Sequence, residues 1–548
     1  MNPYSSMMWR YPHPTPILPD FPMPESTEEI EEFARVQSRL PELFREVFPN
    51  PLAPRTVVVI PSLSLDQAEL KKVSGVHHYE ERMLCMLMLL RLPCTRVIYI
   101  TSQPIVPAVI DYYLGLLSGI PGAHARKRLL LFSCHDASPT PLTQKILARP
   151  RLVQRLRELV SGGEHNHMVC FNATPLERTL SVRLGLPLYA CDPALSYLGS
   201  KSGSREVFRE AGVLLPDGFE NLRDERDVVE ALVTLKRRYP EMRRAVVKLN
   251  EGFSGEGNAL FSYGDLDARS EDLETQIRQR LPSLLRFEAR DETWPRFSRK
   301  FEEMGGIVEC FVEGEVKYSP SVQCRINPLG EINVISTHDQ VLGGPSGQIF
   351  LGCTFPAKGE YRLDIQEAGE KISRVLRSRG VMGRYSVDFI SIPQPDGTWE
   401  HYAIEINLRK GGTTHPFMTL QFLTDGLYDL ETGLYNTPSG QPRFYYASDN
   451  LESESYKGLA AEDLIDIAVY HGLHYHGATQ QGVAFHLIGA LSEFGKFGVL
   501  CIGDTPEKAY ELYTKTVEVM DGATKQARGK NVRVFSILNE AQAADVNG

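Results

Sequence analysis

The stretch Arg384-Tyr-Ser-Val-Asp388-Phe-Ile, followed after a short connection by Ala403-Ile-Glu405-Ile-Asn407-Leu-Arg409, decides the fold of this chain. Polar and apolar residues alternate in both segments, which is the period of a β-strand. The connection contains Pro393-Gln-Pro-Asp-Gly397, a turn sequence. The two segments therefore predict a β-hairpin.

Three oxygen-bearing side chains of this hairpin are predicted to converge on one face. The turn puts Asp388 opposite residues near Ala403–Glu405, and Glu405 and Asn407, two residues apart, share a face. Carboxylates between apolar neighbours are costly to bury without a partner. Mg²⁺ prefers oxygen ligands and is also held by phosphates, so it is the natural partner. The alternative is a hairpin with one solvated polar face.

A second candidate site is an apolar strand that ends in Lys248 and continues into a loop containing Gly252, Gly255 and Gly257. Glycines let backbone amides approach phosphate oxygens, and the lysine supplies positive charge. The spacing is not that of a Walker motif. We predict a phosphate-binding loop, and the alternative is a simple hairpin turn.

A third segment, Ile307-Val-Glu309-Cys-Phe-Val-Glu313-Gly-Glu315, predicts a strand that runs into a short acidic connector. Backbone groups of such a connector can hydrogen-bond an adenine edge, and a nearby carboxylate can accept from ribose hydroxyls. By itself the pattern is unspecific, because acidic turns are usually solvated.

Taken in order, these motifs resemble the ATP-grasp superfamily over roughly Leu198–Asp425. The resemblance implies ATP and Mg²⁺ as cofactors. It also implies these site residues: Lys201, Lys248, Gly255 and Gly257 at the phosphates, Glu309, Cys310, Phe311 and Val312 at the adenine, Glu315 at the ribose, and Asp388, Glu405 and Asn407 on the metal.

The resemblance departs from the family at the arginine of the acyl-phosphate step. The D-alanine ligases carry an arginine two residues before the metal-binding Asp, and this chain has Ser386 there. Arg384 and Arg409 are both candidates for that catalytic role, together with Lys248 at the phosphates. Arg409 is expected on the same strand face as Asn407.

The wider chain resembles the peptide ligases related to the pheganomycin-forming enzyme, with Thr56–Pro193 as their leading domain and Thr479–Gly503 as part of their C-terminal domain. This resemblance implies an ATP-dependent ligase that forms an amide bond through an acyl phosphate. Amino acids or peptides are the implied substrates. Two alternatives stay open: an ATP-grasp kinase, and a non-catalytic nucleotide-binding module.

The fold class implied is α/β, with an α+β ATP-grasp core between two smaller α/β domains. Residues 56–195 alternate short apolar strands with helices, which predicts a Rossmann-like parallel sheet, although no G-x-G-x-x-G is present. The expected strands there are Thr56–Ile60, Arg96–Thr101, Arg128–Phe132, His167–Phe171 and Pro187–Ala190. The other expected parts are residues 1–55 (arm and helix), 196–435 (ATP-grasp), Asn436–Ser455 (linker) and 456–548 (C-terminal domain).

Composition limits the possible partners. The net charge is −10 and the sequence pI about 5.9, which favours neither nucleic acid nor an anionic membrane surface. The 9 cysteines are scattered without a C-x-x-C pair. With no basic leader followed by an apolar core, reduced thiols in the cytoplasm are expected. A homodimer is left open.

Two further stretches have more than one interpretation. His471, His474, His476 and His486 invite a zinc site, but no carboxylate or cysteine completes the set nearby, so ordinary histidines are predicted. The polar, glycine-rich stretch Ser336–Gly352 is expected to be a loop, either a substrate wall or a surface Ω-loop.

Overall fold

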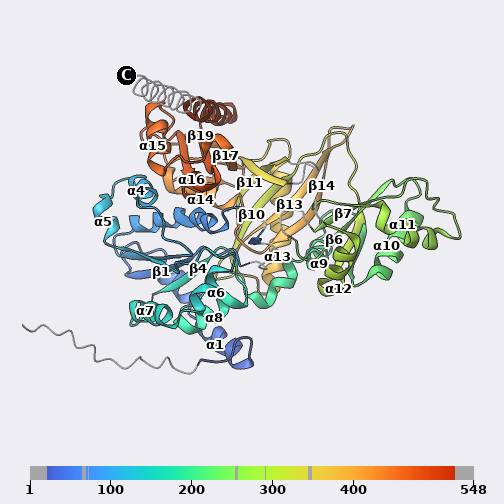
Figure 1. The fold of residues 1–548 in the computed structure, drawn as a ribbon, viewed down its shortest axis with the longest axis horizontal. Coiled ribbons are helices and arrows are strands. Elements are labelled where there is room, and N and C mark those ends of the chain that lie inside the picture. The colour runs from blue at the N-terminus through green and yellow to red at the C-terminus, as the bar shows by residue number, and fades with distance from the viewer. Residues whose placement is uncertain are drawn as a thin grey trace, which may run out of the picture.

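The computed structural model describes residues 21–64, 70–71, 73–163, 165–252, 257–289, 292–343 and 349–524. An α/β part and a long central sheet form the body of the molecule, and a smaller lobe projects from it (Figure 1). The fold is therefore a mixed α/β fold, as predicted. Among the described residues, no helix has the length and apolar character that crossing a membrane requires.

The N-terminal part contains a four-stranded sheet in the order β3-β2-β1-β4, and all its pairs are parallel. The strands are β1 (Arg55–Ile60), β2 (Thr95–Thr101), β3 (Leu129–Ser133) and β4 (His167–Cys170). The helices that lead into or surround it are α1 (Thr27–Gln37), α2 (Leu40–Glu42), η1 (Leu43–Val47), η2 (Val76–Arg91), α4 (Pro107–Gly115), α5 (Gly122–Arg126), α6 (Leu142–Leu147), α7 (Pro150–Val160) and α8 (Pro175–Leu184).

The predicted Rossmann-like pattern is confirmed except for its last strand. Pro187–Ala190 contributes only a single bridge, between Met168 and Leu188. Pro187 has no N–H to donate, and the N–H of Ala190 turns back to the carbonyl of Leu188 at 3.0 Å. The segment therefore leaves the sheet after one pairing.

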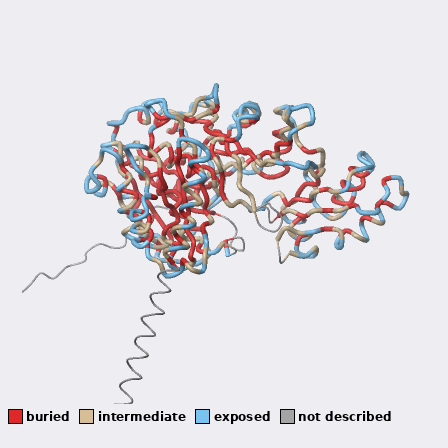
Figure 2. Tube along the Cα trace, turned by 90° about the horizontal axis from the view of Figure 1, so that it is seen from above, coloured by how far each residue is buried: buried red, intermediate tan, exposed pale blue. Residues whose placement is uncertain are grey.

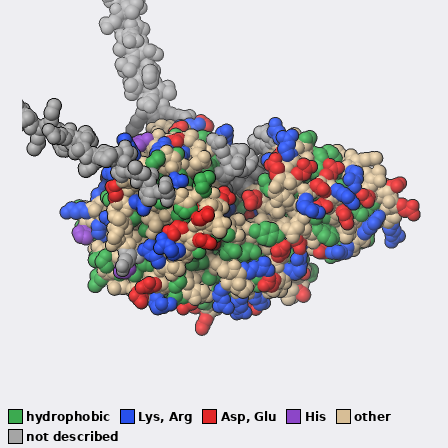
Figure 3. Space-filling view, turned by 90° about the horizontal axis from the view of Figure 1, so that it is seen from below, with side chains coloured by type: hydrophobic (Ala, Val, Ile, Leu, Met, Phe, Trp, Pro, Cys, Tyr) green, Lys and Arg blue, Asp and Glu red, His purple; other side chains and the backbone are tan. Residues whose placement is uncertain are grey.

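The projecting lobe is built on a five-stranded antiparallel sheet in the order β5-β9-β6-β7-β8. It has its own core, to which Val247, Phe261 and Phe297 belong. Figure 3 shows a hollow where the lobe meets the body. The strands and nearby helices are β5 (Gly218–Leu222), β6 (Arg244–Leu249), β7 (Asn258–Ser262), β8 (Leu285–Phe287), β9 (Gly306–Cys310), η3 (Pro193–Gly199), α9 (Lys201–Ala211), α10 (Glu225–Arg238), α11 (Leu273–Leu284) and α12 (Trp294–Met304).

The central sheet has eight strands in the order β14-β13-β10-β11-β12-β17-β19-β18, all antiparallel. The strands are β10 (Pro320–Ile326), β11 (Ile332–Gly343), β12 (Ile349–Phe355), β13 (Gly383–Pro393), β14 (Trp399–Asn407), β17 (Phe444–Glu452), β18 (Gly482–His486) and β19 (Lys496–Gly503). Around them lie α13 (Arg362–Ser378), α14 (Thr414–Thr424), α15 (Ala461–Tyr470), α16 (Leu491–Phe494), η4 (Glu454–Tyr456), η5 (Ile488–Ala490), the pair β15 (Leu427–Asp429) and β16 (Leu434–Asn436), and a helix over residues 506–524.

The interpretation of Asn436–Ser455 as a linker is wrong, because strand β17 lies inside it and pairs with β12 and β19. Its polar residues gave the segment the composition of a loop. Ser448 and Asp449 are buried, and both have polar partners; Ser448 Oγ donates to the carbonyl of Leu351 at 2.8 Å.

The last strands share a core with the N-terminal part. Val57 and Leu87 belong to the same buried cluster as Phe485 and Leu500. In Figure 2 the buried trace is correspondingly dense throughout the body. The division of the chain into four domains stays a prediction, and the central sheet runs through its last boundary.

Candidate functional site

The predicted hairpin is present as β13 and β14. Asp388 pairs directly with Glu405, and Ser386 pairs with Asn407. A bulge follows Asp388, between Asp388 and Phe389. The Asn407 amide donates to Asp388 Oδ2 at 3.1 Å. The three oxygen-bearing side chains thus meet on one face of the sheet, as the sequence predicts.

The electrostatics of this group fit a divalent cation. Burial, together with the neighbouring Glu405, raises the pKa of Asp388 to about 7. Burial also acts to raise the pKa of Glu405, but Lys201 and Arg409 outweigh it and leave that pKa below its ordinary value. Lys201 Nζ lies 2.5 Å from Glu405 Oε1. Two neighbouring carboxylates and an amide oxygen, all on half-buried residues, are a donor set that could hold Mg²⁺.

The two predicted phosphate lysines lie on adjoining segments. Lys201 is the first residue of α9, which is capped by the Ser200 hydroxyl as it accepts from Gly203 N–H at 3.0 Å. The N–H of Lys201 donates to the carbonyl of Asn250, two residues beyond Lys248, at 3.1 Å. Strand β6 and helix α9 therefore present both ammonium groups to the same region.

Lys248 is paired with a residue predicted for the adenine. Its Nζ lies 2.6 Å from Glu309 Oε1, and Arg205 Nη1 donates to Glu309 Oε2 at 2.9 Å. Glu309 lies inside β9 between β5 and β6, so its backbone is committed to the sheet and its side chain faces the lysine. Sequence reasoning missed Arg205, which neutralises Glu309 together with Lys248.

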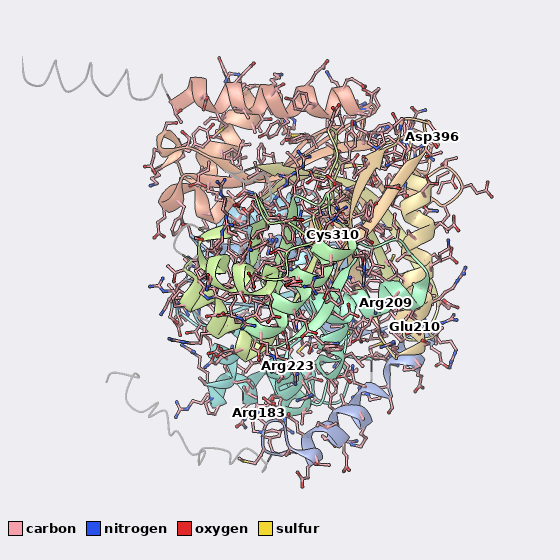
Figure 4. All side chains as sticks on the ribbon, turned by 90° about the vertical axis from the view of Figure 1, so that its right-hand side faces the viewer. Arg183, Arg209, Glu210, Arg223, Cys310 and Asp396 are labelled. Carbon is pink, nitrogen blue, oxygen red and sulfur yellow. The ribbon has the colours of Figure 1, made fainter. Side chains whose placement is uncertain are left out.

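The remaining nucleotide-site predictions fall on the end of β9 and the chain beyond it. Cys310 is the last residue of β9, and its N–H donates to the carbonyl of Asp217 at 2.8 Å. Figure 4 labels Cys310 between the lobe and the β13–β14 hairpin, whose tip carries Asp396. Phe311 and Val312 follow, half-buried, and Glu315 is exposed. These positions stay predictions.

The ends of the glycine-rich loop come together. The N–H of Leu249 donates to the carbonyl of Gly257 at 2.9 Å. A Cβ on Gly252 would lie 3.1 Å from the Cα of Gly257, so the two ends of the loop approach closely here. The predictions on Gly255 fall outside the described residues.

The face that carries Asp388 continues as a polar strip, formed by Ser386, Ser321, Gln323 and Ser336. Strand β10 lies between β13 and β11. Its Ser321 pairs with Asp388 of β13 and with His338 of β11, and its Gln323 pairs with Ser386 and with Ser336 in the same way. Ser321 Oγ, Gln323 Nε2 and Ser336 Oγ are buried and have no hydrogen-bond partner among the described residues. Each buried polar atom without a partner lowers the stability of the fold by about 1–3 kcal/mol. The strip is therefore suited to binding a ligand or water.

Sequence reasoning missed this strip, although a signal for it exists. Residues 320–326 alternate polar and apolar side chains. The apolar set, Val322, Cys324 and Ile326, packs into the core that also contains residues of α13. Ser321 and Gln323 consequently face the opposite side, where Asp388 lies.

The two candidate arginines occupy different positions around the carboxylates. Arg384 lies two residues before Ser386 in β13 and pairs with Arg325 of β10. Its Nη1 is buried and has no partner among the described residues. Burial, reinforced by Arg325, lowers the pKa of Arg384 to about 10. Burial also lowers the pKa of Arg409, although Glu405 and Asp388 oppose that shift.

Arg409 does not continue the strand as expected, because β14 ends at Asn407. The N–H of Arg409 donates to the carbonyl of Asn407 at 2.7 Å, which turns the chain. Arg409 Nη1 then donates to the carbonyl of Lys410 at 3.2 Å, and Lys410 Nζ donates to the carbonyl of Cys170 at 2.5 Å. Contacts with the N-terminal part thus help to hold this turn.

The prediction that Ser336–Gly352 forms a loop is wrong for most of the segment. Strands β11 and β12 occupy it and pair through Val341 and Gly352. A Cβ on Gly352 would lie 2.1 Å from the carbonyl oxygen of Ala447, so this glycine serves close strand contact rather than a turn. Residues 344–348 lie outside the described part of the chain.

Comparison with known proteins agrees with this site. A family model described as "IQCH-like, ATP-grasp" matches residues 193–281 and 268–431, and one described as "PGM1 C-terminal domain" matches residues 463–516. The L-propargylglycine–L-glutamate ligase of Streptantibioticus cattleyicolor is 32% identical over 472 residues, which cover 85% of this chain and 94% of the relative. The chain belongs to the ATP-grasp ligase family. The resemblance to pheganomycin-type peptide ligases and the assignment as an ATP-dependent ligase are confirmed.

Two further comparisons are more distant. The IQ motif-containing protein H of Danio rerio is 23% identical over 515 residues, which cover 85% of this chain and 48% of that protein. A crystal structure of a biotin carboxylase–β,γ-ATP complex from Campylobacter jejuni has a TM-score of 0.50 at 11% identity, covering 86% of this chain and 95% of that one. The latter supports the ATP-grasp fold alone.

For this ATP-grasp site, Lys248→Ala is expected to weaken ATP binding by about 10- to 100-fold, because a hydrogen bond to a charged group contributes roughly 1.5–3 kcal/mol. Arg205 would still pair with Glu309, so no buried carboxylate is left alone. Titration calorimetry measures the Kd. Lys371→Ala, on the exposed surface of α13, is the matched control. Equal affinity in both variants would show that Lys248 does not bind ATP.

Proposed function

We propose that this ATP-grasp ligase activates the carboxylate of one amino acid as an acyl phosphate and joins it to the amine of a second amino acid or a peptide. One observation carries the proposal: the Asp388–Glu405 pair lies between two lysines suited to phosphates and a polar strip with unsatisfied donors. Phosphates and a carboxylate substrate could therefore meet at the same carboxylates.

Asp388, Glu405 and Asn407 would hold Mg²⁺, which when bound supplies neutralising charge to the β- and γ-phosphates. Lys201 and Lys248 bind the phosphates. Lys201 is paired with Glu405, and Lys248 is paired with Glu309.

Arg384 and the polar strip would bind the carboxylate substrate. The unpartnered Nη1 of Arg384 is a charged donor with no acceptor among the described residues, and Gln323 and Ser321 offer neutral donors beside it. Arg409 lies close to Asp388 and Glu405. It is placed to stabilise the oxygen that becomes negative when the amine adds.

The substrates we propose are α-amino acids, with an acidic one among them. The relative from Streptantibioticus cattleyicolor is named for L-propargylglycine and L-glutamate. In this chain Arg325 and Lys410 lie near Arg384, and this supplies more positive charge than a single carboxylate requires. A second carboxylate on one substrate would balance it.

We place the reaction in the cytoplasm. All of the cysteines of the chain are free thiols, which is typical of a reducing compartment.

The reaction class is tested by trapping. With ATP and the accepted carboxylate, hydroxylamine should intercept an acyl phosphate and give a hydroxamate with ADP and phosphate. With an amine substrate, mass spectrometry should show an amide formed in the same amount as phosphate. Pairs of amino acids that include glutamate are the first to screen. AMP and pyrophosphate would show adenylation, and a stable phosphorylated product that ignores amines would show a kinase; either result overturns the proposal.

A further inference from the structure

Three buried side chains from distant segments meet outside the nucleotide site. His415 lies at the start of α14, Asp449 in β17 and His486 at the end of β18, and their side chains are 5%, 8% and 7% exposed. Asp449 Oδ1 is 2.7 Å from His486 Nε2 and 3.1 Å from His415 Nε2. The two Nε2 atoms are themselves 3.1 Å apart.

With Asp449 ionised, no protonation pattern of the two imidazole rings satisfies all three contacts as hydrogen bonds. If both Nε2 atoms carry protons, each can donate to Asp449 Oδ1, but the two donors then face each other at 3.1 Å. If one Nε2 is bare, it can accept from the other, but its lone pair then faces the carboxylate oxygen. Protonating both rings fully changes nothing, because Nε2 is then a donor on each.

A single cation satisfies all three atoms at once, because every lone pair can point toward it. We propose that His415, Asp449 and His486 bind a divalent transition-metal ion, and that the ion is Zn²⁺. In a tetrahedral zinc site, neighbouring ligand atoms are about 3.3 Å apart, given metal–ligand distances near 2.0–2.1 Å. The three contacts here are slightly shorter, so the triangle needs only a small expansion to form one face of a tetrahedron.

The surroundings support this site. Arg82 Nη1 lies 3.4 Å from the other carboxylate oxygen, Oδ2, and helps to orient Asp449.

Glycine at position 498 leaves room for the cluster. A Cβ there would lie 2.1 Å from His486 Nε2, the atom that faces Asp449. Gly498 pairs with His486 in the sheet. A side chain at this position would push the imidazole away from its two partners.

The ion would fix the segment that follows Arg409. Helix α14 begins at Thr414, a few residues after the turn that contains Arg409 and Lys410. His415 therefore anchors that turn to Asp449 of β17 and His486 of β18. Asp388 and Glu405 are separate residues, so this ion is distinct from the Mg²⁺ proposed at the nucleotide site.

The structure changes the interpretation of the histidines. His471, His474 and His476 are exposed, and none of them joins the cluster. The ligand set comes instead from His486 with two residues that lie 71 and 37 positions earlier in the chain. Sequence proximity could not group them.

The test is the metal content of the full-length protein, purified without chelator and dialysed against metal-free buffer. Elemental analysis should find about one equivalent of Zn²⁺ per chain. After removal with a strong chelator, the thermal midpoint should fall, and added Co²⁺ should restore it with visible d–d absorption. Protein that holds less than a tenth of an equivalent, and that does not take up Zn²⁺ or Co²⁺ when offered, would overturn the proposal without any variant.

Variants then locate the ion. His486→Gln keeps an amide able to hydrogen-bond Asp449, so a mere hydrogen-bond network should tolerate it, whereas a metal site should lose its ion. His476→Gln is the matched exposed control and should retain one equivalent. Glu405→Gln should also retain it, which separates this ion from Mg²⁺. Retained Zn²⁺ in folded His486→Gln would place the metal elsewhere and overturn the assignment.

Discussion

Glu405→Gln is expected to lower kcat by roughly three orders of magnitude, because several kcal/mol of charge stabilisation around the phosphates is lost. Glutamine has nearly the same shape as glutamate, so no cavity forms, and the amide keeps one oxygen toward Lys201. The fold should therefore persist. Phosphate release at saturating ATP and Mg²⁺ measures the loss, and circular dichroism checks the fold.

The same hairpin offers a matched control. Asp396 is exposed at its tip, where it accepts from Thr398 N–H at 2.9 Å, and it lies away from the carboxylate pair (Figure 4). Asp396→Asn should turn over like the wild type. If Glu405→Gln does so too, the Asp388–Glu405 pair holds no catalytic metal, and the assignment of this site is lost.

Arg409→Met is expected to lower kcat by about 100- to 1000-fold while leaving ATP affinity nearly unchanged, since removing a group that stabilises developing charge has an effect of that size. Hydroxamate formation should fall in parallel, because hydroxylamine adds to the same carbonyl and makes the same oxygen negative. Steady-state kinetics and hydroxylamine trapping provide the two readouts.

Arg384→Gln separates the two arginines. The proposed role of Arg384 is to bind the carboxylate substrate, so KM for that substrate should rise about 10- to 100-fold with kcat largely kept. Arg379→Gln, which removes an exposed partner of Glu210, is the control and should change neither quantity. A lower kcat with an unchanged KM in Arg384→Gln would instead assign Arg384 to the acyl-phosphate step. Wild-type kinetics in both Arg384→Gln and Arg409→Met would exclude both arginines from these roles.

The sequence alone predicts those parts of the fold whose information is local. The hairpin around Asp388 and Glu405 follows from a two-residue period on either side of a Pro-Asp-Gly turn, and the register confirms it. The parallel sheet follows from strands separated by helices of ordinary length. Lys248 could be picked out because a buried strand ends there and glycines follow.

Composition misled where polar residues are buried with partners. Asn436–Ser455 looked like a linker because Ser448, Asp449 and Asn450 are polar, yet all three lie in β17. The expected loop Ser336–Gly352 is mostly strand for a related reason: its glycines permit close strand contact. A sequence does not show whether a polar side chain will meet water or a partner inside the protein.

Only the tertiary structure could assemble the groups that come from different elements. The polar strip depends on the register of β10 and β11 against β13. Lys201 reaches Glu405, and His415 reaches Asp449 and His486, across long separations in the chain. Hydrophobic periodicity determines which face of a strand or helix is buried, whereas the pairing of those faces, and hence which polar atoms share a site, is decided by long-range packing.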